Sequence, residues 1–328
     1  MKTDNQTGAI LIDRQGAPSV LNYTTVSVNN PKGNEVLIEQ EAIALNFVDV
    51  LFRNGSFPLS AFPATIGVEA AGVVKAIGEK VTTFKIGDRV AYFFSLGAYA
   101  QRRLISANDL VSLPDDVSFD QAAAILAKGL TARMLTRQAY TVKSGDVVLV
   151  HAAAGGVGSL VSRWAKALGA TVIGTVGHAS KKGIAVRHGL DHVVALDTED
   201  LENIVQSVTH GQGVDAVYDG VGKATFSRSV MLTKHGGSIT LFGTASGEPE
   251  ISVSEIEARQ IKLTRPALGN YLRNRDSIEL AANDLFEALR NGVFGEINPS
   301  IYPLSQAAKA HQDLESGQTT GSVIFHVK

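Results

Sequence analysis

The chain has 328 residues, of which 45% are hydrophobic and 19% are charged, a balance that suits folded domains and excludes an intrinsically disordered chain. A formal net charge of -2, with both signs interspersed, gives no reason to expect nucleic acid or an anionic membrane as a partner. The chain contains no cysteine, which excludes disulfides, thiolate catalysis and every cysteine-ligated metal centre.

The first part of the chain, from Ala9 to about Ala107, alternates short apolar runs with glycine-containing turns. Strands are expected at 35–44, 71–77 and 88–94. Long helical periodicity is absent there, so we predict a mostly antiparallel β domain. Asp49 and Arg53 stand four residues apart, a spacing that predicts a local ion pair rather than catalytic groups.

The pattern changes near Ser118, a candidate N-cap for a helical stretch. From Asp146 onward, apolar strands and amphipathic helices alternate. Strands are expected at 147–151, 171–176, 192–196, 216–218, 238–242 and 261–264, and helices at 157–168, 181–188, 201–209 and 225–232. Helices at 277–290 and 305–315 and a strand at 321–327 follow. The βαβα alternation predicts a parallel, doubly wound sheet.

The stretch DVVLVHAAAGGVG, residues 146–158, has the order strand, glycine-rich turn, helix in which a nucleotide pyrophosphate sits on a helix N-terminus. Against the pattern G-x-G-x-x-G, Ala153 replaces the first glycine. The predicted pyrophosphate contacts are Ala154, Gly155, Gly156, Val157 and Gly158. A tight turn without a ligand is the alternative, and the flanking strand, helix and further βα units favour dinucleotide binding.

The end of the following strand bears on which dinucleotide is bound. It reads Gly177–His178, and no carboxylate that would bind both ribose hydroxyls appears before Asp191. Lys181 and Lys182 open the next helix instead, and they would attract a 2′-phosphate. We therefore predict NADPH, bound through Gly177, His178 and Lys181; the alternative is that the lysines are a solvated helix face.

The histidines do not predict a metal site. His188 and His192 are separated by Gly189 at the end of a helix, and the pattern H-E-x-x-H is absent from the sequence. His151 ends the strand before the glycine-rich turn and is expected to be a hydrogen-bonded structural histidine. No catalytic metal is expected.

Several collinear segments then indicate a family: 46–58, 66–74, 87–92, 122–132, 151–158, 164–177, 217–222 and 264–266. Over essentially its whole length the chain resembles the zinc-free, zeta-crystallin-like quinone oxidoreductases of the medium-chain dehydrogenase/reductase superfamily. Other members of the superfamily bind zinc through a cysteine near the position of Asn46 and through a histidine at the position of Val68, and this chain has neither. The chain departs from the family pattern at Arg163, a change expected on a helix surface, and at Leu51, Phe57 and Leu196, where relatives carry tyrosine.

The resemblance implies a GroES-like catalytic domain at 1–126, completed by 269–328, and a Rossmann NADPH-binding domain at 127–268, with the active site in the cleft between them. It further implies metal-free, NADPH-dependent reduction of quinones by a cytoplasmic homodimer. The implied residues are Asn46, donating to a quinone oxygen; Arg265, a cationic contact; and Thr131, Phe242 and Gly243, holding the nicotinamide half. The alternatives are a turn residue at Asn46, a helix residue bonded to its own backbone at Thr131 and a structural ion pair at Arg265.

Two other functions remain open at this point. One is NADPH-dependent reduction of α,β-unsaturated carbonyl compounds, in which hydride would go to carbon. The other is a nucleotide-binding protein with a structural or RNA-binding role, which the charge does not favour because no basic stripe is present. The polar N-terminal residues 1–10 and the lack of a long apolar run predict neither a secretory signal nor a membrane span.

Overall fold

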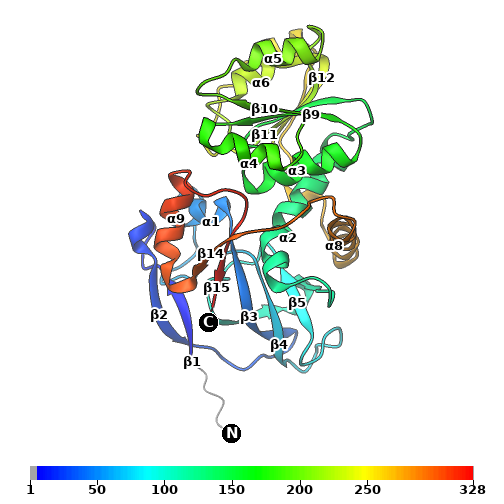
Figure 1. Cartoon of the computed structure of the whole chain (residues 1–328). Helices are drawn as coiled ribbons and strands as arrows, with labels where there is room; N and C mark the ends of the chain where they lie inside the picture. The colour runs from blue at the N-terminus through cyan, green and yellow to red at the C-terminus, as the bar shows by residue number, and fades with distance from the viewer. Residues whose placement is uncertain (1–5, 328) are drawn as a thin grey trace. The chain divides into compact units, whose positions relative to one another are not determined.

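The computed structural model describes residues 6–327, which form two compact units (Figure 1). Unit 1 contains the chain up to Ala127 together with Asn274–Ala282 and the residues from Ile297 onward. Unit 2 contains Lys128–Arg273 and Asn283–Glu296. Helices α2 (Phe119–Met134) and α8 (Arg275–Arg290) contribute residues to both units.

Unit 1 is built on a largely antiparallel sheet. Its strands are β3 (Glu35–Leu45), β4 (Ala70–Ile77), β5 (Arg89–Tyr92), β6 (Arg102–Ser106), β7 (Leu110–Ser112), β14 (Ser300–Pro303) and β15 (Val323–His326). They follow the order β14-β15-β3-β4-β5-β7, with β6 also paired to β3. Strands β1 (Gln6–Leu11) and β2 (Asn22–Ser27) form a separate antiparallel pair. The predicted antiparallel β domain is confirmed.

Alternating burial along the first part of β3 shows that one face of this strand is covered by the core of unit 1. Val36, Ile38 and Ile43 are fully buried and belong to the apolar core of unit 1. The helix α9 (Ala307–Glu315) adds Ala307 and Ala310 to the same core. A strand near the end of the chain, β15, pairs with β3, so the C-terminal segment is part of this sheet.

Unit 2 is a parallel sheet with helices on both faces. The strands are β8 (Val147–Val150), β9 (Thr171–Val176), β10 (His192–Ala195), β11 (Val214–Asp219), β12 (Thr233–Leu241) and β13 (Lys262–Thr264). They follow the order β10-β9-β8-β11-β12-β13, which is the 3-2-1-4-5-6 order of dinucleotide-binding sheets. The doubly wound sheet predicted from the sequence is therefore confirmed.

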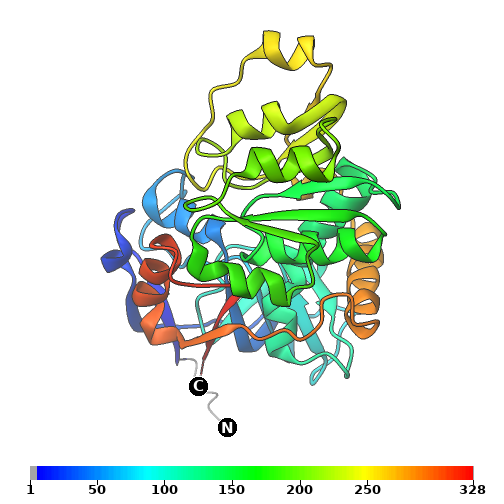
Figure 2. The same cartoon turned by 45° about the horizontal axis from the view of Figure 1, so that its top comes forward.

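The helices of unit 2 cover this sheet on opposite sides. They are α3 (Gly156–Ala167), α4 (Lys182–Arg187), α5 (Leu201–Val208), α6 (Phe226–Leu232) and α7 (Val253–Ala258). Figures 1 and 2 show α3 and α4 on one face and α5 and α6 on the other. Because both faces are covered, the central strand β8 is apolar, and its Val148, Leu149 and Val150 are fully buried.

Arg163 has a structural role that differs from the expected helix-surface position. It lies half-buried on α3 and donates a hydrogen bond to the carbonyl oxygen of Phe294, whose ring packs edge-on against Trp164. Arg133 forms an ion pair with Asp284 at 2.6 Å in the same part of the molecule. These contacts join residues 283–296 to the rest of unit 2, residues 128–273. Partial burial of Arg163 lowers the pKa of its guanidinium.

Two short helices were not predicted from the sequence. They are α1 (Phe47–Asn54) and α7, the former inside the β-rich part of the chain. The start of α1 carries a readable signal, because Asn46 is its N-cap and Asp49, three residues on, accepts from the N–H of Asn46. None of the helices within residues 6–327 combines the length and the apolarity that spanning a bilayer requires.

Candidate active site

The glycine-rich turn after β8 has the geometry of a nucleotide-binding loop. Gly155 is the N-cap of α3, and its N–H donates to the carbonyl oxygen of Ala152 at 2.8 Å. A Cβ added to Gly158 would lie 2.3 Å from that same oxygen, so only glycine allows the turn to approach the helix this closely. The N-terminus of a twelve-residue helix therefore follows β8 with its first N–H groups close to the turn.

Ala153, which replaces the first glycine of the motif, is accommodated by a glycine elsewhere. Ala153 is fully buried, and its N–H donates to the carbonyl oxygen of Thr175 at 2.8 Å. A Cβ added to Gly174 on β9 would lie 2.7 Å from the Cβ of Ala153. The missing side chain at Gly174 thus makes room for the methyl group of Ala153, which explains why the imperfect motif still forms the turn.

The loops after β11 and β12 pack against each other. Phe242 donates its N–H to the carbonyl oxygen of Asp219 at 2.9 Å, and a Cβ added to Gly220 would lie 2.7 Å from the Phe242 ring. A Cβ added to Gly243 would lie 2.8 Å from the carbonyl oxygen of Gly220. Two of the three predicted nicotinamide contacts, Phe242 and Gly243, are therefore held by the neighbouring loop.

Buried polar groups support these loops from below. The Nδ1 of His151 lies 2.9 Å from the Thr175 hydroxyl, and its Nε2 lies 3.1 Å from the Ser229 hydroxyl. Ser229 donates to Asp219, whose other oxygen accepts from the N–H of Gly222 at 3.0 Å. Burial lowers the pKa of His151. His151 has partners at both ring nitrogens, as expected of a structural histidine.

The turn after β9 contains the residues predicted to bind a 2′-phosphate. Gly177 is in open space, because an added Cβ would meet no protein atom within 4 Å, and the turn continues through His178 to Lys181. Lys182 forms an ion pair with Glu199 at 2.6 Å, so part of its charge is balanced within the protein. The open space at Gly177 leaves room for a ligand close to the backbone.

The predicted nucleotide contacts thus gather at one edge of the unit 2 sheet. The loops that follow β8, β9 and β12 hold residues 154–158, residues 177–181 and residues 242–243, and the carboxyl ends of parallel strands share one edge. This edge, at the point between β8 and β11 where the strand order reverses, is where doubly wound sheets bind ligands. An open turn, close-packed glycines and helix N–H groups together fit a dinucleotide such as NADPH.

Two other predicted contacts lie elsewhere in unit 2. Thr131 is half-buried on α2. Arg265 borders a surface pocket of about 490 Å³, and its guanidinium forms an exposed ion pair with Glu248 at 2.6 Å. The pocket is lined by Thr264, Arg265, Pro266, Asn270, Tyr271 and Arg273. Arg265 therefore forms an ion pair, which the alternative interpretation of this residue expected, and it also places a positive charge at the pocket.

In unit 1, Asn46 is held by two acidic residues. Its side-chain Nδ2 donates to Oε2 of Glu69 at 2.8 Å, and its backbone N–H donates to Oδ2 of Asp49 at 2.9 Å. The other oxygen of Glu69 accepts from the N–H of Ala127 at 2.7 Å. A carboxylate only accepts hydrogen bonds, so the nitrogen of the Asn46 amide must face Glu69. The Nδ2 group carries a second N–H that a ligand oxygen can accept.

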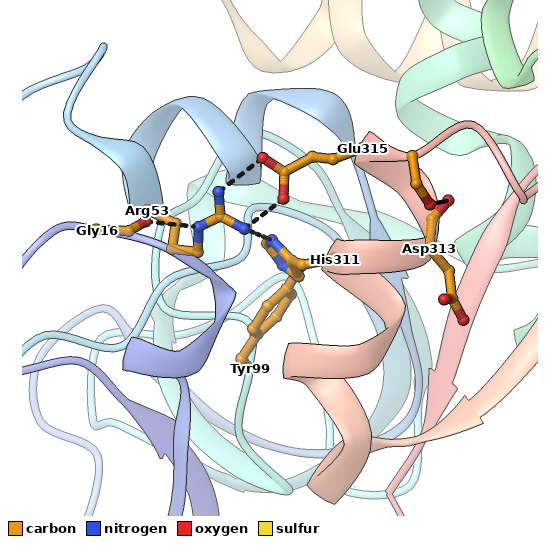
Figure 3. A network of polar contacts seen from close by, with 7 residues as sticks. Gly16, Arg53, Tyr99, His311, Asp313 and Glu315 are labelled. Atoms are coloured by element: carbon orange, nitrogen blue, oxygen red, sulfur yellow. Dashed lines mark hydrogen bonds and ion pairs between the residues drawn. The ribbon is translucent and has the colours of Figure 1, made fainter.

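Asp49 connects Asn46 to a buried polar network that sequence reasoning missed. The Tyr99 hydroxyl donates to Asp49 at 3.1 Å. It also lies 2.9 Å from Nε2 of His311, and Figure 3 shows Tyr99 and His311 beside Arg53. Nδ1 of His311 lies 3.5 Å from Arg53, which binds Glu315 through two hydrogen bonds of 2.6 and 2.8 Å. The Asp49–Arg53 ion pair stays a prediction, and tertiary contacts give each of the two side chains a partner outside α1.

The donor directions in this network require a neutral His311. Arginine only donates, so Nδ1 of His311 accepts and Nε2 carries the proton that faces Tyr99. The Tyr99 hydroxyl is then available to donate to Asp49. Burial and the neighbouring Arg53 lower the pKa of His311 to about 3, which keeps the ring neutral near pH 7. Burial and the Asp49 carboxylate raise the pKa of Tyr99.

The residues present do not fit a zinc ion. The chain has no cysteine, and Val68 precedes Glu69 where a histidine would be needed. Among residues 6–327, no three histidine, aspartate or glutamate side chains gather in a way that would hold a metal. The side chains of Asn46 and Glu69 instead form a hydrogen bond with each other, so no step of the chemistry is assigned to zinc.

Comparisons with known proteins assign both parts of the chain to dehydrogenase domains. Residues 32–115 match the family of alcohol dehydrogenase GroES-like domains, and residues 156–285 match the family described as zinc-binding dehydrogenase. The first match lies in the β-rich unit 1. The second covers the helix α3, which follows the nucleotide loop, and most of the parallel sheet. These two domains define the class of medium-chain dehydrogenases and reductases.

Full-length relatives define the family within that class. The chain is 39% identical to a quinone oxidoreductase of Pseudomonas aeruginosa, covering 94% of this chain and 96% of the relative. It is 38% identical to a 2-haloacrylate reductase of Burkholderia, covering 97% and 98%. The crystal structure of an Escherichia coli quinone oxidoreductase complexed with NADPH is similar with a TM-score of 0.94, at 38% identity over 97% of this chain and 99% of that one. The chain belongs to the quinone oxidoreductases of the medium-chain dehydrogenase/reductase superfamily.

Proposed function

We propose that this protein reduces quinones with NADPH, without a metal ion. The observation that carries the proposal is the loop between β8 and α3, where Gly158 approaches Ala152 so closely that any side chain would clash with the Ala152 carbonyl oxygen. Family membership supplies the reaction type, and the adjoining loops leave room for a dinucleotide. When bound, NADPH would supply the hydride that the chain's own side chains cannot provide.

The chain's residues then bind and orient the reactants. Residues 154–158 would hold the pyrophosphate through backbone N–H groups, and Lys181, with Gly177 and His178, would contact the 2′-phosphate. Thr131, Phe242 and Gly243 would hold the nicotinamide half. Asn46, its amide orientation set by Glu69, would donate its second Nδ2 proton to the quinone oxygen as negative charge develops there. Arg265 is proposed as a cationic contact.

The test is a titration with NADPH and NADH followed by turnover with a quinone panel. We expect rapid NADPH oxidation with 1,4-benzoquinone and 9,10-phenanthrenequinone. Asn46→Ala should lower quinone turnover about tenfold or more while leaving NADPH affinity unchanged, since one positioned hydrogen bond is removed. No NADPH oxidation with any quinone would overturn the proposed activity, and unchanged turnover of the variant would overturn the role of Asn46.

A second candidate reaction is reduction of a carbon–carbon double bond conjugated to a carbonyl or carboxyl group. The 38% identity to a 2-haloacrylate reductase over nearly the whole chain favours including it. The same panel therefore contains 2-haloacrylates and alkenals. Turnover of these compounds without quinone turnover would make this reaction the better description of the protein.

We also propose the assembly, location and domain roles expected from the sequence. The domain formed by 1–126 and 269–328 would carry the substrate, and the domain at 127–268 would carry NADPH. The protein would act in the cytoplasm as a homodimer. Light scattering of the purified chain tests the dimer, and cell fractionation tests the location.

A further inference from the structure

A carboxylate that the sequence pattern did not reveal lies at the proposed 2′-phosphate contacts. Strand β10 runs parallel to β9, with Ala195 beside Val176, so Asp197 falls level with His178 just beyond the strand ends. Oδ2 of Asp197 lies 3.3 Å from Nδ1 of His178 and accepts from the N–H of Ala179 at 3.3 Å. The acidic residue that is missing after β9 is thus supplied by the turn that follows the neighbouring strand, β10.

The charges around this turn oppose each other. On the cationic side are Lys181 and Lys182; on the anionic side are Asp197 and Glu199. Glu199 is engaged with Lys182 at 2.6 Å and also accepts from the N–H of Ala195 at 2.8 Å. Asp197 faces His178 and Ala179, where the side chain of His178 is 74% exposed and that of Asp197 is 28% exposed. A ligand at His178 would therefore meet the Asp197 carboxylate.

We propose that Asp197 is a specificity-determining residue that reduces the preference of this enzyme for NADPH over NADH. A carboxylate repels a 2′-phosphate through a poorly screened charge interaction at short range. The same carboxylate can accept hydrogen bonds from ribose hydroxyls, as the acidic residue of NAD-binding sites does. This inference rests on the proposed function, because it takes residues 177–181 as the adenosine end of the dinucleotide site.

The experiment is Asp197→Asn, with binding of 2′,5′-ADP and 5′-AMP measured by calorimetry. These two nucleotides differ by the 2′-phosphate and need neither the nicotinamide half nor turnover. Asparagine keeps the shape and an oxygen that accepts from Ala179, so the turn is maintained. We expect 2′,5′-ADP to bind roughly tenfold more tightly and 5′-AMP to change little or weaken; the gain should shrink at high salt.

Asp191→Asn is the matched control, because it removes the same charge from the opposite end of the same strands. Asp191 accepts from the N–H of Val172 at 2.8 Å, near the start of β9, and forms an ion pair with Lys166. Because β9 has six residues at about 3.3 Å each, the two carboxylates are well separated. The control should leave the ratio of the two nucleotide affinities unchanged.

Equal changes in both affinities on Asp197→Asn would overturn the proposal. Weaker 2′,5′-ADP binding would overturn it too, since Asp197 would then be arranging His178 and Ala179 for the phosphate. These outcomes differ from failure of the proposed function. If the unaltered protein binds neither NADPH nor NADH, the proposed dinucleotide site is wrong. If the unaltered protein binds NADPH and reduces quinones but Asp197→Asn does not change the selectivity between the two nucleotides, only the proposed role of Asp197 is wrong.

Discussion

The side-chain amide of Asn46 and the buried carboxylate of Glu69 form a hydrogen bond, Nδ2 to Oε2, at 2.8 Å. Glu69 is fully buried, and its second oxygen accepts from the N–H of Ala127 at 2.7 Å. Both carboxylate oxygens therefore have a defined donor. The pair orients the residue that we propose to face the quinone.

Glu69→Gln should slow quinone reduction about tenfold without weakening NADPH binding. Asn46 and Ala127 donate to different oxygens of Glu69, and a glutamine would place a donating NH2 group at one of these two positions. Loss of a charge-assisted hydrogen bond of about 1.5–3 kcal/mol releases the Asn46 amide. The measurement is the steady-state kcat and KM for quinone, together with NADPH titration.

A double-mutant cycle separates this positioning role from general destabilisation. In an Asn46→Ala background, Glu69→Gln should have almost no further effect on kcat, because the group that it orients is gone. A loss as large as that seen with Asn46 present would contradict the positioning role. Thermal unfolding of each variant checks that the fold is retained.

Lys181→Ala should weaken NADPH binding about tenfold and NADH binding much less. The reason is the loss of one charge-assisted contact to the 2′-phosphate. Lys182→Ala is the matched comparison, and its effect should be smaller because Glu199 already balances Lys182 at 2.6 Å. Dissociation constants from fluorescence titration decide the point, and equal effects on both dinucleotides would reject the phosphate contact.

Gly158→Ala and Gly177→Ala should separate folding of the loop from ligand contact. A Cβ at Gly158 would lie 2.3 Å from the Ala152 carbonyl oxygen, so this variant should lose NADPH binding and thermal stability together. A Cβ at Gly177 would meet no protein atom within 4 Å, so thermal stability should be unchanged while NADPH affinity falls. Undiminished NADPH affinity in Gly177→Ala would show that the dinucleotide does not approach this backbone.

Stability should decrease as the pH falls from about 6.5 toward about 3, partly because of His311. The pKa of His311 is lowered to about 3 in the folded protein, against roughly 6.5 in an unfolded chain. Between these values the unfolded chain binds one more proton at His311 than the folded protein does. The free energy of unfolding therefore decreases as the pH is lowered, by at most about 1.4 kcal/mol per pH unit for this group. Above about pH 6.5 the histidine adds no slope.

His311→Gln tests this assignment through urea unfolding midpoints over the acidic range. The variant should show a shallower pH dependence than the unaltered protein, although its stability near neutral pH is lower because the contacts with Tyr99 and Arg53 change. His235→Gln, at an exposed histidine, is the control and should keep the original slope. An unchanged slope in His311→Gln would contradict the assignment.

Local sequence determined the architecture and the class of ligand. Periodicities of two residues and of about three and a half predict strands and helices, because each element must bury one face, and their alternation after Asp146 implies a parallel sheet. The glycines at 155–158 predict a phosphate-binding turn because close backbone approach is a local steric requirement. Even α1 carries a local signal, in the spacing of Asn46 and Asp49.

Tertiary structure alone decided the partners of the charged side chains. Arg53 binds Glu315, 262 positions away in the sequence. Glu69 reaches Asn46 across 23 positions, and Asp197 stands beside His178 because β10 is in register with β9. A long polar side chain can reach many groups, and which one it meets depends on how strands distant in sequence are paired. Sequence spacing sets secondary structure, whereas the electrostatics of the site follow from this pairing.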